Sequence, residues 1–297
     1  MAAPIEVSGL RKVYAGKAAV DGVDLQIEAG EVFALLGPNG AGKTTTVEIL
    51  EGFRRRDGGD VSVLGQDPQT AGLGWRSRIG MVLQGSTGLD LLTAREALAS
   101  TAKVYPRARD VDEVLDAVGL SDKANDRISR LSGGQRRRLD VALGIVGAPE
   151  LLFLDEPTTG FDPQARRDFW GLIGSLADGG TTILLTTHYL DEAEHLADRV
   201  GVIAAGQMLA LDTPANLGGR ASSRATVGWE DLAGVRHTTT TDTPTQVVAA
   251  LAAELGGEVP KLTVSRPSLE DTYLTLIAPH VVDAHAVDPH SADEVVA

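Results

Sequence analysis

A glycine-rich loop between an apolar segment and a helix-forming segment most constrains what this chain can fold into. Glu31–Leu36 form a β-rich run, and Thr44–Gly52 have the pattern of a helix. Glycines let the main chain between them close around an anion, so that successive N–H groups and the helix N-terminus point at it. A lysine there adds positive charge, and a threonine hydroxyl can ligate Mg²⁺. We therefore predict a phosphate-binding loop, rather than a plain turn with a surface lysine, formed by Gly37, Pro38, Asn39, Gly40, Ala41, Gly42, Lys43, Thr44 and Thr45.

Strand-like and helix-like segments alternate along much of the chain. This alternation requires crossover connections and predicts an α/β fold with a largely parallel sheet covered on both faces. Ligands of such sheets bind beyond the carboxyl ends of the strands. The expected strands are Ile5–Tyr14, Val23–Ile27, Glu31–Leu36, Val61–Leu64, Ile79–Leu83, Leu151–Leu154, Thr181–Thr186 and Val200–Ala204. The expected helices after Thr44–Gly52 are Ala94–Tyr105, Val111–Val118, Gly134–Val146, Gln164–Leu176 and Leu190–Ala197.

The composition changes near Gly218–Ala225, where Gly, Ser and Arg residues become frequent. A fresh strand–helix–strand–helix pattern then runs to about Ile277, and no Lys or Arg follows Arg266. We predict a large domain at residues 1–217, a small α+β domain at 218–278 and a disordered acidic tail at 279–297.

The charge balance excludes one class of partner. The 297 residues include 41 acids and 27 bases, a formal net charge of −14, which repels phosphate backbones, so nucleic acid is not an expected partner. The absence of cysteine excludes thiol catalysis, disulfides and thiolate metal sites. The first residues lack an export signal, and charges interrupt every later apolar stretch before about 18 residues. We expect a chain that is neither exported nor membrane-spanning, so that any transport role needs a separate membrane subunit.

Two acids follow the apolar run Leu151–Leu154. Carboxylates at the end of a buried strand are costly unless they have partners. Beside a phosphate loop, the first acid can hold Mg²⁺ and the next can polarise an attacking water. We assign Asp155 to the metal and Glu156 to the general base. The alternative is that both simply begin the turn Glu156–Gly160.

A third element is a serine followed by two glycines at the start of an expected helix. Such a helix start presents a hydroxyl and unhindered N–H donors, which suits an anion. A simple N-cap is the alternative. The residues of this signature segment are Leu131, Ser132, Gly133, Gly134 and Gln135.

The order and spacing of these elements resemble the ATP-binding subunit of ABC transporters over roughly Ile5–Leu217. The similarity rests on the phosphate loop, Leu131–Gln135, Leu151–Thr158 and Thr187–His188. It implies a P-loop ATPase domain with a mixed, largely parallel sheet and a helical signature subdomain at about residues 85–145. It also implies hydrolysis of ATP to ADP and phosphate, with ATP and Mg²⁺ as cofactors.

The same resemblance assigns roles to single residues. Tyr14 would stack on adenine, and His188 would contact the γ-phosphate. Gln84 would reach Mg²⁺ or the attacking water and sense the membrane partner. A buried strand aromatic, a structural histidine and a solvated loop amide are the respective plain alternatives. Asp162 matches the acid of the loop that crosses the dimer interface, where Phe161 replaces the more usual leucine.

In this family, the signature segment of one subunit closes over ATP bound to the phosphate loop of another. Because the chain carries one copy of each motif, the resemblance implies a homodimer that sandwiches ATP. Separation of the dimer after hydrolysis would move attached permease subunits, which places the chain on the cytoplasmic side of the cell membrane.

Two segments narrow the resemblance to one branch. Thr187–Glu194 and Ser268–Tyr273 resemble the exporter class that includes daunorubicin-resistance and other drug, antibiotic or polysaccharide carriers. The second segment also has the pattern of a capped amphipathic helix. A soluble ABC ATPase that acts without a membrane is the main alternative. A DNA-repair ATPase is disfavoured, because those families insert long segments where only a short interval separates Lys43 from Leu131.

Overall fold

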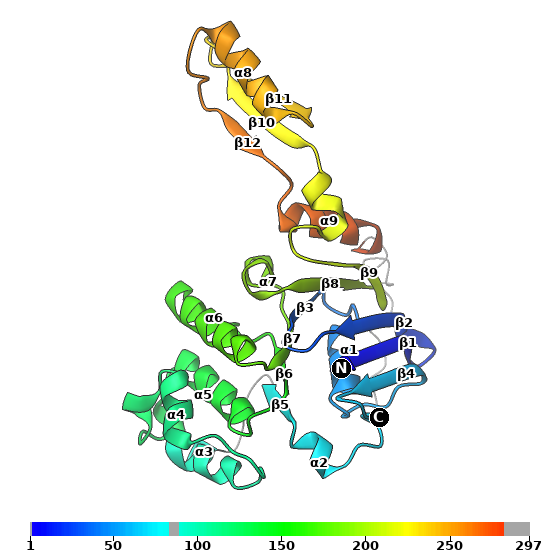
Figure 1. Ribbon diagram of the computed structural model, residues 1–297, viewed down its shortest axis with the longest axis vertical. Helices are drawn as coiled ribbons and strands as arrows, with labels where there is room; N and C mark the ends of the chain where they lie inside the picture. Colours follow the sequence, from blue (N-terminus) through cyan, green and yellow to red (C-terminus); the bar gives the residue numbers. More distant parts are fainter. Residues whose placement is uncertain (1, 83–88, 282–297) are drawn as a thin grey trace, which may run out of the picture. The chain divides into compact units, whose positions relative to one another are not determined.

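The structure is a computed structural model that describes residues 2–82 and 89–281. The chain divides into two compact units, Met1–Leu211 (unit 1) and Asp212–Ala297 (unit 2) (Figure 1). The division lies ahead of Leu217, where the sequence predicts the end of the large domain. All residues of the phosphate loop, the signature segment and the acidic pair belong to unit 1.

A six-stranded sheet forms the centre of unit 1, in the order β5-β6-β7-β3-β8-β9 (Figure 1). The strands from β5 to β8 pair in parallel. β9 follows β8 through Ala205 and Gly206, whose φ angles of 48° and 79° are those of a tight hairpin, so β9 runs antiparallel. This confirms the predicted α/β fold with a mixed, largely parallel sheet. The strands are β3 (Val32–Leu36), β5 (Ile79–Val82), β6 (Leu151–Asp155), β7 (Thr182–Thr186), β8 (Arg199–Ala204) and β9 (Gln207–Asp212).

An antiparallel sheet with the order β2-β1-β4 shares one hydrophobic core with the six-stranded sheet. This core joins Ile5 and Val23 of the antiparallel sheet to Phe33 and Phe153 of the parallel sheet, with Ile49 of helix α1 in the same cluster. Packing therefore fixes α1 at the point where the phosphate loop leaves β3. The elements are β1 (Ile5–Tyr14), β2 (Lys17–Ile27), β4 (Gly58–Val63) and α1 (Lys43–Leu50), followed by the short α2 (Leu73–Arg76).

Between β5 and β6 the described residues form three α-helices that contact one another, with buried leucines such as Leu98 and Leu115. The last of them, α5, also packs on β5. An added Cβ at Gly80 of β5 would lie 2.3 Å from the carbonyl oxygen of Gly144 in α5. Because neither position carries a side chain, the helix lies directly on the strand. The three helices are α3 (Ala94–Ala102), α4 (Val111–Ala117) and α5 (Gly133–Ile145).

Two further helices flank the carboxyl ends of β6 and β7. Helix α6 (Pro163–Asp178) begins after the loop that follows the acidic pair, and α7 (Leu190–Leu196) begins after His188. The two helices contact each other, and α7 also contacts β3. Across residues 2–82 and 89–281, no helix combines the length and apolar character needed to cross a bilayer.

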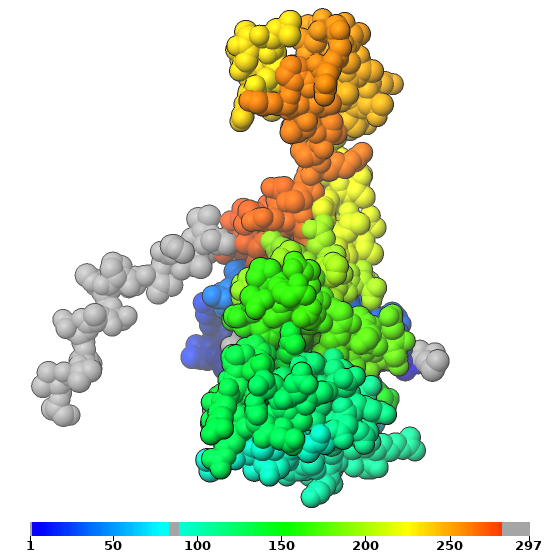
Figure 2. Space-filling view, turned by 90° about the vertical axis from the view of Figure 1, so that its left-hand side faces the viewer, coloured from blue at the N-terminus to red at the C-terminus, as the bar shows by residue number. Residues whose placement is uncertain are grey.

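Unit 2 contains a small antiparallel sheet with the order β11-β10-β12. Helix α8 packs on β10 around Val227, Leu251 and Val259. Figure 2 shows the orange part of this unit in contact with its yellow part. Helix α9 contacts the short 3-10 helix Leu217–Ser222. The elements are β10 (Ala225–Glu230), β11 (Arg236–Thr241), α8 (Pro244–Leu255), β12 (Thr263–Ser265) and α9 (Leu269–Val281).

Several boundaries differ from the sequence-based expectations. β2 begins at Lys17 rather than Val23, because pairing with β1 through irregular register extends it over residues that lack strand periodicity. The half-buried edge strand β9 was not predicted. Helix α9 continues through Pro279 to Val281, past the expected end near Ile277. The rest of the predicted tail lies outside the described residues.

Candidate active site

The loop after β3 lies in close contact with the neighbouring strands β2 and β8. Gly42 is the N-cap of α1 with a φ of 106°, and an added Cβ there would lie 2.4 Å from the carbonyl oxygen of Ala19 in β2. An added Cβ at Gly37 would lie 2.2 Å from the carbonyl oxygen of Ile203 in β8. The positive φ of Gly42 and the close approaches at both positions exclude side chains, so the chain's own packing requires these two glycines.

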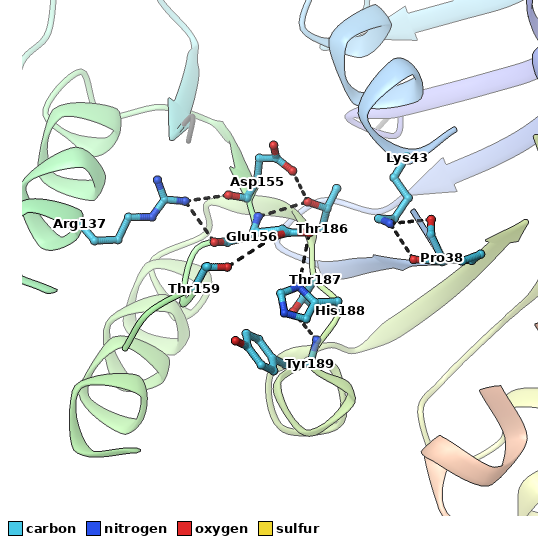
Figure 3. Close-up of polar contacts among 11 residues, drawn as sticks. Pro38, Lys43, Arg137, Asp155, Glu156, Thr159, Thr186, Thr187, His188 and Tyr189 are labelled. Atoms are coloured by element: carbon cyan, nitrogen blue, oxygen red, sulfur yellow. Dashed lines mark hydrogen bonds and ion pairs between the residues drawn. The ribbon is translucent and has the colours of Figure 1, made fainter. Parts of the chain in front are cut away.

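Lys43, the first residue of α1, folds its ammonium group back over the loop. Its Nζ donates to the carbonyl oxygens of Gly37 at 2.6 Å and Pro38 at 3.1 Å (Figure 3). Burial lowers the pKa of Lys43, and the charges of Glu156 and Asp155 oppose this shift. The loop therefore contains a buried positive charge that interacts with the two carboxylates.

A cleft of about 470 Å³ opens between the phosphate loop and the end of β6. Its size is typical of small-molecule sites. The structure thus brings together the adenine-stacking candidate, most of the phosphate loop and both acids. The lining residues are Tyr14, Ala19, Asn39–Thr45, Asp155 and Glu156.

A larger groove of about 720 Å³ crosses the β2-β1-β4 sheet, but its charges do not suit phosphate. The acids Asp24 and Asp60 are among its lining residues. Its Arg56 makes two hydrogen bonds of 2.8 Å with the carboxylate of Asp67. The smaller cleft is therefore the better candidate for an anionic ligand.

Asp155 is the last residue of β6 and lies opposite Thr186 of β7 in the parallel register. The Thr186 hydroxyl donates to Oδ1 of Asp155 at 2.5 Å. The strand thus includes Asp155, one residue beyond its predicted end at Leu154. This contact fixes the carboxylate at the carboxyl edge of the sheet, where the cleft opens.

Glu156 follows in a sharp turn with a φ of 44°, a conformation that costs a residue with a side chain about 1–2 kcal/mol. Its N–H donates to the carbonyl oxygen of Thr186 at 3.0 Å. Its Oε1 lies 3.4 Å from Nδ1 of His188, and its Oε2 accepts from Thr159 Oγ1 at 3.5 Å (Figure 3). The ends of β6 and β7 therefore bring the proposed base and the predicted histidine together.

The signature segment forms the start of α5. Ser132 Oγ accepts from the N–H of Gln135 at 3.3 Å, and Gln135 Oε1 accepts from the N–H of Ser132 at 3.0 Å, which is a capping box. An added Cβ at Gly133 or Gly134 would meet no atom of residues 2–82 or 89–281 within 4 Å. Helix capping thus accounts for Ser132 but not for the two glycines. Among the described residues that line the cleft, none comes from Leu131–Gln135.

Asp162 is the N-cap of α6 and accepts from the N–H groups of Gln164 and Ala165, both at 2.9 Å. These hydrogen bonds, that from Ala165 foremost, lower the pKa of Asp162. Phe161 is buried and packs edge-to-face on Phe169 with ring centroids 5.8 Å apart. An aromatic partner therefore accommodates the phenylalanine that replaces the usual leucine.

The oxygen donors of the cleft fit Mg²⁺ that arrives with a nucleotide. Thr44 and Asp155 both line the cleft. The described part of the chain contains no group of three or more His, Cys, Asp or Glu that could hold a metal ion. Mg²⁺ usually binds one or two carboxylates and completes its shell with water and substrate phosphates. The third predicted ligand, Gln84, lies outside the described residues.

Among the described residues, Thr186 and Arg137 contact the acidic turn, and the sequence did not predict either contact. The contact of Thr186 is described above. Nε of Arg137 donates to the carbonyl oxygen of Pro157 at 3.0 Å, and its Nη2 donates to that of Asp155 at 2.7 Å. The run Arg136–Arg138 is visible in the sequence. Helical periodicity alone does not show which of the three arginines faces the turn.

Comparison with known proteins gives the family. The ABC transporter family matches residues 20–159. The chain is 47% identical over 218 residues to the daunorubicin/doxorubicin resistance ATP-binding protein DrrA of Streptomyces peucetius, covering 72% of this chain and 66% of that protein. It is 41% identical over 220 residues to Nod factor export ATP-binding protein I of Burkholderia thailandensis, covering 72% of each. The matched region thus spans about two thirds of DrrA.

A solved structure has the same fold. The dimeric post-hydrolysis state of the ATP-binding cassette MJ0796, bound to ADP and Pi, is similar with a TM-score of 0.64 at 24% identity. The similarity covers 70% of this chain and 98% of that one. Fold, motif order and sequence identity agree: the chain belongs to the ABC transporter family and carries that family's ATP-binding, ATP-hydrolysing domain.

Proposed function

We propose that this chain is the ATP-hydrolysing subunit that powers an ABC exporter. The observation that carries the proposal is the convergence of Lys43, Asp155 and Glu156 on one cleft. In this proposal the loop N–H groups and Lys43 bind the β- and γ-phosphates, and the adenine stacks on Tyr14.

Each of the remaining site residues has a separate role at the γ-phosphate. Thr44 and Asp155 would hold Mg²⁺, which would neutralise charge on the phosphate oxygens. Glu156 takes a proton from the attacking water as general base. His188 reaches the γ-phosphate from the end of β7, and its 3.4 Å contact with Glu156 supports a shared role in positioning the water.

The space around the two glycines of the signature segment supports a site shared between two copies of the chain. Among the described residues no atom lies within 4 Å of an added Cβ at Gly133 or Gly134, and both lie at a helix N-terminus, where N–H groups suit an anion. We infer that Leu131–Gln135 of one copy closes over ATP bound to the phosphate loop of another. The solved structure of MJ0796 is dimeric, which supports a homodimer in the ATP-bound state. Asp162 would then lie in the loop at the interface.

The relatives support a transport role. DrrA is named for drug resistance and the Burkholderia protein for export. We infer an integral membrane permease as partner, export of drugs, antibiotics or other hydrophobic or polymeric cargo, and a place on the cytoplasmic side of the cell membrane. Hydrolysis of ATP would open the closed dimer and so drive the permease.

Affinity purification in mild detergent tests this proposal. The Glu156→Gln chain with ATP and Mg²⁺ should retain the closed dimer and recover a multispanning membrane protein. The matched control is Lys43→Ala, which should lose ATP-dependent recovery because it lacks the phosphate-binding charge. Recovery of soluble partners alone would overturn the exporter assignment in favour of a soluble ABC ATPase.

A further inference from the structure

We propose that Arg137 is a positioning residue that holds the main chain of the catalytic turn and so couples the signature helix α5 to the general base. The inference rests on the proposed ATPase function and adds one residue to its site. Figure 3 shows Arg137 approaching the Asp155–Glu156 turn from α5, on the side away from Lys43.

The guanidinium of Arg137 reaches three consecutive carbonyl groups. Nη2 donates to Asp155 O at 2.7 Å and lies 3.4 Å from Glu156 O, while Nε donates to Pro157 O at 3.0 Å. The planar fork of arginine can serve several acceptors at once, whereas a lysine ammonium acts as a compact point charge. These contacts bracket Glu156, whose φ of 44° is strained and needs support from its surroundings.

The charged guanidinium of Arg137 is largely shielded from solvent. Only 11% of its side chain is exposed, and its Nη1 lies 3.9 Å from Asp140 Oδ2 one turn further along α5. Burial lowers the pKa of Arg137, while the charges of Asp140, Asp155, Glu192 and Glu156 oppose this shift. Carbonyls and carboxylates together therefore hold the guanidinium in place.

Because of its position in the chain, Arg137 can link the signature segment to the catalytic turn. It lies in α5, the helix that begins with the signature segment, and the close approach of Gly144 to Gly80 seats the same helix on β5. If the start of α5 shifted, for example on closing over a partner's ATP, Arg137 would transmit that shift to the Glu156 backbone. The signature of a chain would thus influence the base of that chain's own site.

Steady-state hydrolysis by purified full-length chain tests the role, with Arg137→Ala, Arg137→Lys and the matched control Arg138→Ala. Arg138 pairs with Asp168 instead of the turn. For both Arg137 variants we expect kcat to fall about 10- to 100-fold, because small misplacements of catalytic groups cost rates of this size, with a far smaller change in ATP affinity. Added methylguanidinium should restore part of the activity of Arg137→Ala only. Arg138→Ala should hydrolyse ATP like the unmodified chain.

Thermal unfolding of each variant separates positioning from folding. If Arg137→Lys unfolds and binds ATP like the unmodified chain and hydrolyses it as fast, the proposal is wrong. It is also wrong if methylguanidinium rescues nothing and kcat, ATP affinity and melting temperature decline together, since that pattern describes a purely structural arginine. Failure of the unmodified chain to hydrolyse ATP at all would instead overturn the proposed function.

Discussion

Buried ionisable side chains lie near the phosphate loop, and one of them is Glu51, the C-cap residue of α1. Only 6% of Glu51 is exposed. Burial, followed by the charges of Asp155 and Glu48, raises the pKa of Glu51 from 4.5 to about 8. The folded chain therefore holds this proton where the unfolded chain releases it.

This shift predicts a stability change with pH in the absence of nucleotide and Mg²⁺. The contribution of Glu51 to folding is complete below pH 4.5 and is lost as the pH rises through about 8. At about 1.4 kcal/mol per pH unit, the loss reaches several kcal/mol. Glu51→Gln should raise the melting temperature at pH ~9 and change it little at pH ~4. The exposed Glu28→Gln serves as control, and equal shifts in both variants would contradict the prediction.

Thr186 predicts a metal effect at the neighbouring residue. Thr186→Val removes the hydroxyl that donates to Asp155 but keeps the buried volume. Loss of such a supporting hydrogen bond typically weakens metal binding about 10- to 100-fold. We expect the Mg²⁺ concentration for half-maximal ATPase activity to rise accordingly. Thr182→Val on the same strand, whose hydroxyl contacts Gly30 instead, should leave it unchanged. Equal Mg²⁺ dependence of the two variants would exclude this role for Thr186.

At the scale of elements, the start of α5 combines helix capping with the proposed contact to a partner's ATP. Ser132→Ala removes the capping oxygen and should cost about 1 kcal/mol of unfolding free energy. Ser132→Asp keeps a capping oxygen but adds negative charge where phosphate would bind. We expect Ser132→Asp to unfold like the unmodified chain in a denaturant titration and still to lose ATPase activity. Full activity of Ser132→Asp would leave capping as the only role of this serine.

The sequence predicts elements best where a strand or helix carries its own pattern. The apolar runs before Gly37 and before Asp155 are buried on both faces of the sheet. Such strands are apolar at successive positions, so the bounds of β3 and β6 could be predicted closely. The first half of β2 and the edge strand β9 form because they pair with the neighbouring strands β1 and β8. The local residue pattern does not show which segments will pair, so it did not predict them.

The same distinction applies to the site. The phosphate loop and the acidic pair are local motifs, and their convergence follows from parallel strands that end at one edge. The contacts of Arg137 and Thr186 with the turn depend on how α5 packs on β5 and how β7 pairs with β6, which a single sequence does not specify. The roles assigned to Tyr14 and His188 came from family resemblance and stay predictions.

At the scale of the whole molecule, the account predicts ATP-dependent self-association. Glu156→Gln should elute as a dimer in size-exclusion chromatography with light scattering when ATP is present, and as a monomer without it. An added Cβ at Gly134 meets no described atom within 4 Å, so we expect Gly134→Leu in the same background to keep the melting temperature of Glu156→Gln alone, yet to stay monomeric with ATP. A dimer that forms equally well with leucine at this position would contradict a shared site.

The most direct test of the central claim measures nucleotide binding and hydrolysis together in the unmodified chain and in Glu156→Gln, with Mg²⁺ present. A general base typically contributes a factor of about 10²–10⁴ in rate. The account predicts that both chains bind ATP with similar affinity and that Glu156→Gln hydrolyses it slower by about that factor. Near-normal turnover in Glu156→Gln, or no ATP binding by either chain, would contradict a single site formed by Lys43, Asp155 and Glu156.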